Sequence, residues 1–584
     1  MRLTPALSLR FTLALLLAAP LLAQTPTVRL ESPVPPPEWA LLERALLRAA
    51  SDGTAAFAAH YLDERDFLKC VERWGGNDGA DDAMENFHGW TLLYALGGDD
   101  QVLADYQRAW EGHLTQFTEA RAPGIEMAEN GMYWREFVTS FDWEHTGEAL
   151  AAFHVYSLTR PDDPHYRTRV RRFARFYTGD DPYADNYDRD KKIIKSIHNG
   201  SRGAKVTPAS EMDWGGLPVE GDPERLTRYA TASNIKGDHP LNLGTTALGY
   251  NAYLLTGEQR FRDWTLEYAG AWRDRIVDNG GNIPTNIGLN GEIGGEWGGK
   301  WYGGTFGWNF WPQSGGRNYF IRGPRIAMGL ATLLTGDKSY LEALRLQIRN
   351  LYAAKKVENG QVLLPGKYGD DGWYGYSRNE RLDVQRDLYL YTFDKTHLEG
   401  LDRDPWLRYL NGAAPDYPVR ALRGEIESVR RRVQGLQADN MARDQRTSDH
   451  SQRFNPAEVD SLTQLTLGAN PPGTSGNILH TRLLYYDPAR RRVGLPEDVA
   501  ALVESITPQG LKVRLVNLNP LEPRKVLVQA GAYREHRFGS IRGDAQAAVN
   551  GSLFQVELAP GAGGALEIGL ELLANRPSLG MPWD

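Results

Sequence analysis

The feature of this sequence that most limits its fold is a helical hairpin that recurs along the chain. Four segments that are apolar on nearly every helical face each run into a tight turn with Gly or Pro and a following acid. Amphipathic segments come after the turns, at residues 166–177, 262–276 and 340–352. Helices that are apolar all round are buried, so the first helix of each hairpin should lie inside and the second outside. The apolar segments are residues 90–96, 149–158, 245–255 and 326–334.

The hairpins are spaced too irregularly for a solenoid, and a weaker fifth copy occupies residues 387–410. We therefore predict hairpins arranged around a ring, with every short turn at one end. The connections that return the chain are longer than the usual ~2–8 residues between packed helices, which is typical of functional loops. They should meet at the other end of the ring and form one cleft there. These loops are residues 118–145, 179–243, 278–318 and 358–381.

The last part of the chain has a different pattern. Residues 424–446 form a highly charged helix, and residues 469–475 are a linker rich in Pro and Gly. From residue 478 onward, short alternating apolar runs are separated by turn residues, which is typical of antiparallel strands. The sequence thus predicts a mainly α chain with a β tail, divided into a helical domain over residues 24–470 and a small antiparallel β-sandwich over residues 471–584.

The N-terminus has the pattern of a signal peptide. Arg2 and Arg10 precede an apolar run that is too short for an ordinary membrane-spanning helix and that ends at the small residue Ala23. We predict that residues 1–23 are removed and that the protein is exported, periplasmic or secreted, without stable membrane association. An uncleaved anchor is the alternative, because Leu21 departs from the usual cleavage-site pattern.

Charge and cysteine content exclude several classes of protein. The chain has 66 Lys and Arg against 74 Asp and Glu, which gives a net charge of −8. This mildly acidic balance is not typical of nucleic-acid binding. Cys70 is the single cysteine, so internal disulfides and metal centres built from several cysteines are excluded.

Acid–His pairs stand where three connections lead into an apolar helix. Carboxylates and bound anions are favoured at a helix N-terminus, although acids at this place also serve simply as helix caps. We predict His88 as a substrate-binding residue and the other two groups as catalytic. The pairs are Glu85 with His88, Asp142 and Glu144 with His145, and Asp238 with His239.

The loop at residues 279–316 interleaves glycines with tryptophans, so that backbone and flat apolar faces can approach a sugar. We predict Glu296 as a further catalytic residue and Lys300, Trp301 and Tyr302 as substrate-binding residues. An acidic sugar would also need Arg, which binds a carboxylate in bidentate fashion. The other predicted substrate-binding residues are Trp214, Arg317, Trp373, Tyr376 and Arg378.

Metal binding has weak support in the sequence. A run of acids at residues 180–190 could bind Ca²⁺, but it lacks the spacing of an EF-hand loop. His88, His145 and His239 could converge on a metal, but no His-x-x-x-His pattern joins them. We predict no cofactor and no metal, with Ca²⁺ as a weakly supported alternative.

The recurring hairpins, the aromatic loop at residues 296–304 and the trailing β region together resemble the (α/α)-toroid enzymes that act on uronic-acid polysaccharides. The pattern is most similar to glycoside hydrolase family 154, a β-glucuronidase family, and residues 528–536 look like part of it. The resemblance implies an (α/α)6 toroid followed by a β-domain, and a glycan partner that contains uronic acid.

Three functions are compatible with these residues. A hydrolase would place Asp142 or Glu144 across the cleft from Asp238 or Glu296, with His145 and His239 tuning proton transfer. A polysaccharide lyase would instead use a Tyr or His as base, with Tyr302, Tyr376 and His239 as candidates. A glycan-binding protein without activity would need only the Trp and Tyr side chains.

Overall fold

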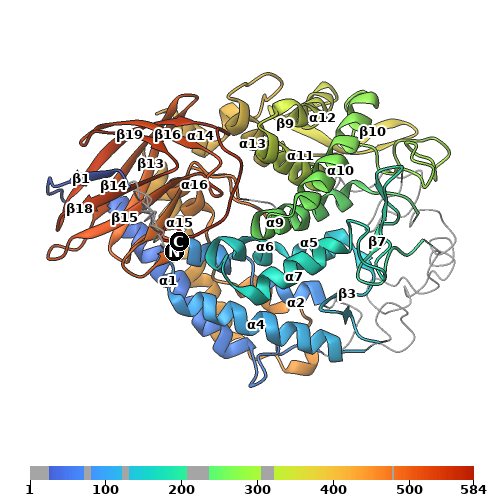
Figure 1. Cartoon of the computed structure of the whole chain (residues 1–584), viewed down its shortest axis with the longest axis horizontal. Coiled ribbons are helices and arrows are strands. Elements are labelled where there is room, and N and C mark those ends of the chain that lie inside the picture. The colour runs from blue at the N-terminus through green and yellow to red at the C-terminus, as the bar shows by residue number, and fades with distance from the viewer. Residues whose placement is uncertain (1–24, 72–79, 122–129, 207–235, 304–320, 476–478) are drawn as a thin grey trace, which may run out of the picture.

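The computed structural model of the chain describes residues 25–71, 80–121, 130–206, 236–303, 321–475 and 479–584. Figure 1 shows the helices grouped on one side of the molecule and most of the strands on the other. Two of the predicted site residues, Trp214 and Arg317, and the predicted signal peptide lie outside the described residues.

The predicted hairpins are confirmed at four places along the chain. The first helix of each is almost wholly buried: α3 (Trp90–Leu96), α6 (Ala151–Thr159), α9 (Thr246–Thr256) and α11 (Arg322–Thr335). These helices pack against one another in chain order. Gly97, Gly257 and Gly336 end three of them in the left-handed conformation, where φ lies between 72° and 117°. Their turns therefore need Gly for a backbone reason.

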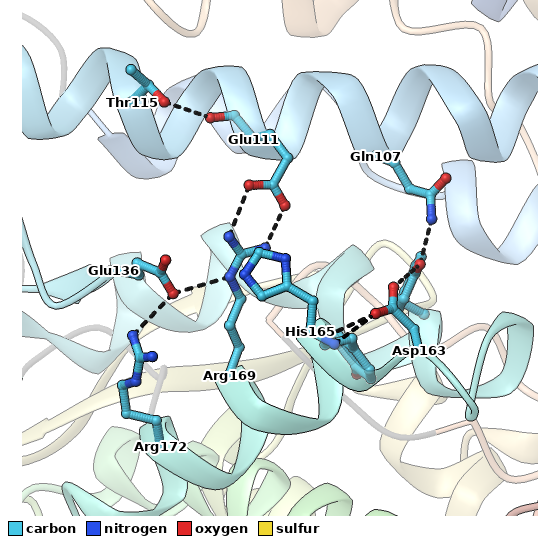
Figure 2. Close-up of polar contacts among 10 residues, drawn as sticks. Gln107, Glu111, Thr115, Glu136, Asp163, His165, Arg169 and Arg172 are labelled. Atoms are coloured by element: carbon cyan, nitrogen blue, oxygen red, sulfur yellow. Dashed lines mark hydrogen bonds and ion pairs between the residues drawn. The ribbon is translucent and has the colours of Figure 1, made fainter.

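The second helix of each hairpin covers the first. These outer helices are α4 (Asp100–Glu119), α7 (Pro164–Arg175), α10 (Gln259–Asp278) and α12 (Glu342–Ala353). Figure 2 shows how α4 and α7 are joined through charge, with Arg169 of α7 between two acids. The guanidinium of Arg169 donates to both carboxylate oxygens of Glu111 on α4 and, at 3.1 Å, to Glu136. Arg172, one turn later, donates to the same Glu136 at 3.0 Å.

The helical part continues beyond these hairpins. The weaker fifth copy folds as α13 (Leu382–Thr392) and the short α14 (Pro405–Leu410). The predicted charged helix is α15 (Tyr417–Ala438), which packs along α1 (Glu38–Tyr61). The buried helix α16 (Asp460–Leu467) then packs against α3, near the chain's first hairpin. Two short helices, α2 (Ala80–Glu85) and α5 (Trp143–Ala149), lie before α3 and α6.

The β region consists of two five-stranded sheets. One has the order β1-β18-β15-β11-β12 and the other β13-β14-β19-β16-β17. Their longer strands are β11 (Leu483–Asp487), β13 (Val499–Thr507), β14 (Gly510–Asn517), β15 (Arg524–Ala530), β16 (Arg537–Gly543), β18 (Leu553–Leu558) and β19 (Gly563–Glu571). The edge strands β12 (Arg492–Val493) and β17 (Ala547–Gly551) are short.

The structure corrects two parts of the predicted fold. Strand β1 (Thr27–Leu30), from the predicted helical span, pairs with β18 in parallel, so the first sheet is not purely antiparallel. The predicted loop at residues 358–381 is largely a hairpin of β9 (Gln361–Gly369) and β10 (Gly372–Ser377), preceded by β8 (Lys356–Glu358). The description as mainly α is therefore only partly right. None of the described helices combines the length and apolar character that crossing a membrane would require.

Candidate functional site

One cavity of the described structure has a volume of about 860 Å³ and lies where inner helices begin. Glu85 and His88 reach it from the approach to α3, and Arg325 comes from the first turn of α11. Asp383 lies at the start of α13, and Asp460 is the first residue of α16. Several helix entries thus meet at one cavity, but no described residue of the predicted cleft loops at residues 118–145, 179–243, 278–318 and 358–381 lines it.

A second cavity of about 570 Å³ adjoins the first. The two share Arg325, Asp383, Gly473 and Thr474, so a ligand could extend from one into the other. The described lining of the second cavity is strongly cationic, because it contains one acid, Asp383, against several basic residues. Its basic residues are Arg322, Arg325, Lys367 and Arg381.

Glu85 is held in an environment that favours its protonated form. Burial and the neighbouring carboxylate of Glu148 both raise the pKa of Glu85. Gln452 donates to its carboxyl group at 2.6 Å. Glu148 in turn accepts from Arg322 at 2.8 Å, and its backbone oxygen lies 3.0 Å from Nε2 of His88. Glu85 therefore fits the role of a proton donor at neutral pH.

Asp383, in contrast to Glu85, lies in an environment that favours its ionised form. Burial alone would raise its pKa, but Arg325, the backbone N–H of Val384 and two further arginines, Arg386 and Arg381, together hold the pKa of Asp383 below its usual range. Arg325 Nη1 donates to Asp383 at 2.8 Å, and its Nε donates to Asp387 at 2.5 Å. Asp383 keeps about half of its side-chain surface exposed. It is therefore an ionised and accessible carboxylate.

Asp460 is a second carboxyl group with a raised pKa in the same cavity. Burial is the main cause, Glu458 adds to it, and Arg386 and Arg432 oppose it. Arg432 is already paired with Glu458 at 2.8 Å. Asp460 is thus an alternative to Glu85 as a proton donor in this cavity.

The predicted catalytic group around α5 lies outside the two cavities described above. Asp142 caps the helix by accepting from the backbone N–H of His145 at 3.1 Å. Its carboxylate also lies 2.7 Å from Nδ1 of the His145 ring. Glu144 is buried, which raises its pKa to about 8, and it lies 3.8 Å from Arg322. None of these three residues is among those that line the two cavities.

Asp238 is a completely buried acceptor. Its carboxylate accepts from the backbone of Ile194 at 3.1 Å and from the side chains of Tyr268 and Trp272 at 2.9 Å each. Asn242 donates to it at 2.9 Å. Burial raises the pKa of Asp238 to about 6 in spite of these donors. The residue organises the loop, and its side chain does not reach either cavity.

His239 and Glu296 also lie outside both cavities. His239 is buried, which lowers its pKa to about 3, and its Nδ1 accepts from Leu241 at 3.3 Å. Glu296 accepts from the backbone of Leu289 at 3.0 Å. All six predicted catalytic residues are thus described, and none lines the two cavities.

Four predicted substrate-binding residues do come together, although away from the two cavities. The rings of Trp301, Tyr302 and Trp373 gather around Tyr368, with centroids 4.7–5.0 Å from its ring. Lys300 and Tyr302 donate to Asp370 at 2.6 and 2.7 Å. This cluster ties residues 285–303 to the β9–β10 hairpin.

The remaining predicted residues are scattered. Of these, His88 lines the large cavity; burial lowers its pKa, so its ring is neutral there. Tyr376 packs beneath Lys356, whose Nζ lies 4.0 Å from the ring centroid. Arg378 is exposed and lines neither cavity.

The acids at residues 180–190, which the sequence offered as a weak Ca²⁺ site, form ion pairs with basic side chains. Asp180 pairs with Arg260 at 2.8 Å and Asp181 with Arg135 at 2.8 Å. Asp185 and Asp188 pair with Lys195 and Lys191. These ion pairs compensate the charges of four of the five acids in the run, all except Asp190.

Comparison with known proteins places the chain in a family. The model of a family described as "Domain of unknown function (DUF8034)" matches residues 27–390 and 381–463. The chain belongs to the DUF8034 family. The match covers the helical part with β1, and ends before most of the β region. A comparison with curated proteins gave no match.

Solved structures show distant likeness to this DUF8034 protein. A sugar epimerase from a ruminal bacterium is 10% identical, with 71% of this chain and 97% of the other covered and a TM-score of 0.39. Cellobiose 2-epimerase from Bacillus thermoamylovorans is 9% identical, with coverage of 70% and 98% and a TM-score of 0.36. The GH76A alpha-1,6-mannanase from Salegentibacter is 12% identical, with coverage of 73% and 99% and a TM-score of 0.32. Likenesses of this size establish no shared activity.

The cavity residues that sequence reasoning missed also lie at the entries of inner helices, where the ring hypothesis places cleft residues. Arg322, Arg325, Asp383 and Asp460 all lie in the first turns of inner helices, as the ring hypothesis requires of cleft residues. The signal was present in the charged residues just before or within the apolar segments. The sequence analysis selected acid–His pairs at the helix entries and other residues from the loops, and so did not select these four.

Proposed function

We propose that this DUF8034 protein is a carbohydrate-active enzyme that hydrolyses glycosidic bonds, with Glu85 as general acid and Asp383 as base or nucleophile. One observation carries the proposal: two carboxyl groups line the same cavity, and their surroundings move their pKa values in opposite directions. Hydrolysis of a glycosidic bond needs one protonated and one ionised carboxyl group. The two groups come from α2 and α13, which stand apart in Figure 1.

We further propose that the substrate is a glycan containing uronic acid, as in the β-glucuronidases that the sequence resembles. The cationic character of the adjoining cavity supports this choice, since basic side chains attract a sugar carboxylate. The inner helices α3, α6, α9, α11, α13 and α16 would then be those of an (α/α)6 toroid. Export of the enzyme, with residues 1–23 as signal peptide, is part of the same proposal.

Hydrolysis is preferred over elimination because of where the predicted lyase bases lie. Tyr302 lies in the cluster around Tyr368, Tyr376 packs beneath Lys356, and His239 is buried. None of the three lines either cavity. A base in those places would lie outside the two cavities in which we place the sugar.

Kinetics of two amide variants test the proposal. Glu85→Gln and Asp383→Asn should each lower kcat by about 100-fold to 10,000-fold on an aryl β-glucuronide or a uronic-acid oligosaccharide, with the fold intact. Asp142→Asn is the matched control, because an amide can still cap α5, and it should stay within a few-fold of the wild type. Asp460→Asn tests the alternative proton donor.

Three outcomes would contradict the proposal. Full activity in both the Glu85→Gln and Asp383→Asn variants would refute the assigned pair. An unsaturated, ultraviolet-absorbing product would show a lyase instead. Binding of uronic-acid oligosaccharides without any turnover would show a glycan-binding protein.

A further inference from the structure

We propose that Arg381 and Lys367 form the subsite that holds the carboxylate of the substrate, and that they set the preference for an acidic over a neutral sugar. The inference rests on the proposed function for the place of the reaction, since the subsite adjoins the cavity that contains Asp383. It assigns recognition to residues other than those predicted from the sequence.

The four basic residues of the second cavity differ in whether their charge is compensated. Arg322 pairs with Glu148 at 2.8 Å, and Arg325 pairs with Asp383 and Asp387. Arg381 and Lys367 have no ion pair among the described residues. Two positive charges therefore line this cavity without a salt bridge to a described carboxylate, although Asp383 lines the same cavity. A bound carboxylate would supply that salt bridge.

The surroundings of Arg381 make an unpaired charge costly. Burial lowers the pKa of its guanidinium, and the positive charge of Arg322 lowers it further, while Asp383 acts in the opposite direction. A basic group that is partly removed from water and close to a second cation is stabilised by an anionic ligand. Exposed Lys and Arg residues elsewhere on the molecule do not have this cause to bind an anion.

The backbone of Arg381 takes an uncommon conformation. Its φ of 57° and ψ of 41° place a non-glycine residue in the left-handed region, directly before α13. Such a conformation costs free energy and must be held by the surrounding structure. Two contacts hold it: the Arg381 N–H donates to Asn379 at 3.0 Å, and its carbonyl accepts from Gln385 at 3.1 Å.

The position of Arg381 relative to Asp383 suits a single sugar residue. The two are separated by one residue, so their Cα atoms lie at most about 7 Å apart. Lys367 comes from β9, across the cavity lining from α13. A sugar whose glycosidic bond approaches Asp383 would thus present its carboxylate to the planar guanidinium of Arg381, with Lys367 as a second point charge.

Binding and kinetics with Arg381→Met and Lys367→Met test the subsite. Wild-type protein should bind D-glucuronate more tightly than D-glucose in calorimetry, and Arg381→Met should lower affinity for D-glucuronate by about 10-fold to 100-fold. Lys367→Met should have a smaller effect. Neither change should alter binding of D-glucose. Arg378→Met is the matched control, because Arg378 lies three residues before Arg381 but is exposed and outside both cavities.

The outcomes separate this inference from the proposed hydrolase. If Arg381→Met and Lys367→Met both bind D-glucuronate as the wild type does, the subsite is wrong, whatever the activity. If D-glucuronate binding depends on Arg381 while no glycan is hydrolysed, the subsite stands and the hydrolase proposal fails. Equal or better binding of inorganic sulfate than of D-glucuronate would overturn the assignment to a sugar carboxylate.

Discussion

Glu85 and Asp383 face one cavity under opposite electrostatic influences, and this difference predicts the pH dependence of activity. Rate should fall as pH rises through the raised pKa of Glu85 and as pH drops through the lowered pKa of Asp383. Glu148→Gln removes a negative charge beside Glu85, so the alkaline limb should move about one pH unit lower. Arg325→Met should move the acidic limb higher. Profiles of kcat/KM against pH measure both, and an unmoved alkaline limb in Glu148→Gln would exclude Glu85 as the acid.

Sequence reasoning selected acids and histidines at helix entries but could not assign their protonation states. Glu85 stands in the same acid–His motif as His88, and only His88 was selected from it. The pKa of Glu85 is raised by burial and by Glu148, which lies on a different element, and this raised pKa supports the proposed role of Glu85 as proton donor. Asp238 shows the converse, since its motif looked the same but Tyr268 and Trp272 of α10 enclose it. Such contacts join residues too far apart in the chain for spacing to predict.

Among the elements, α11 depends on close contact with the 3-10 helix at Pro240–Thr245. A Cβ atom on Gly323 would lie 2.0 Å from the backbone oxygen of Pro240, so no side chain fits there. Gly323→Ala should destabilise the protein by about 1–3 kcal/mol and displace Arg322 and Arg325, which lowers activity as well. Gly329→Ala on the same helix is the control, since its nearest neighbour would be the Tyr391 hydroxyl at 3.5 Å. Denaturant unfolding and kinetics measure both effects, and equal behaviour of the two variants would refute the contact.

Elements were predictable where one face or all faces are apolar, and less so where glycine dominates. The segment at residues 90–96 is a helix with the predicted bounds, because it is apolar all round. The β9–β10 hairpin was predicted as a loop, since its glycines and mixed aromatic residues show no clean alternation. That hairpin supplies Lys367, so the missed element is also the one that carries part of the proposed subsite.

At the scale of the whole molecule, the sequence indicated a helical region and a β region, but not that a strand near the N-terminus belongs to the β region. β1 comes before the first helix, yet it pairs with β18 near the C-terminus. Four residues with an unremarkable pattern cannot reveal a partner more than 500 residues away in sequence, whereas helical hairpins are formed by neighbours in the chain. The β region is thus connected to the helical part twice: once through α1, which follows β1, and once through the segment between α16 and β11.

A buried acid at this junction predicts how stability depends on pH. Glu43 of α1 accepts from the backbone of Ala501 in β13 at 3.2 Å, and burial raises its pKa from 4.5 to about 8. The folded state therefore holds a proton more tightly than the unfolded state does. Its stabilising effect is complete below pH 4.5 and is lost as pH rises toward 8. Glu43→Gln cannot ionise, so near pH 8 it should be more stable than the wild type by about 1–3 kcal/mol, with no gain near pH 4.5. Thermal unfolding at several pH values measures the difference, with the exposed Glu38→Gln on the same helix as control. A gain of equal size at every pH would contradict the burial of an ionisable carboxyl group at this junction.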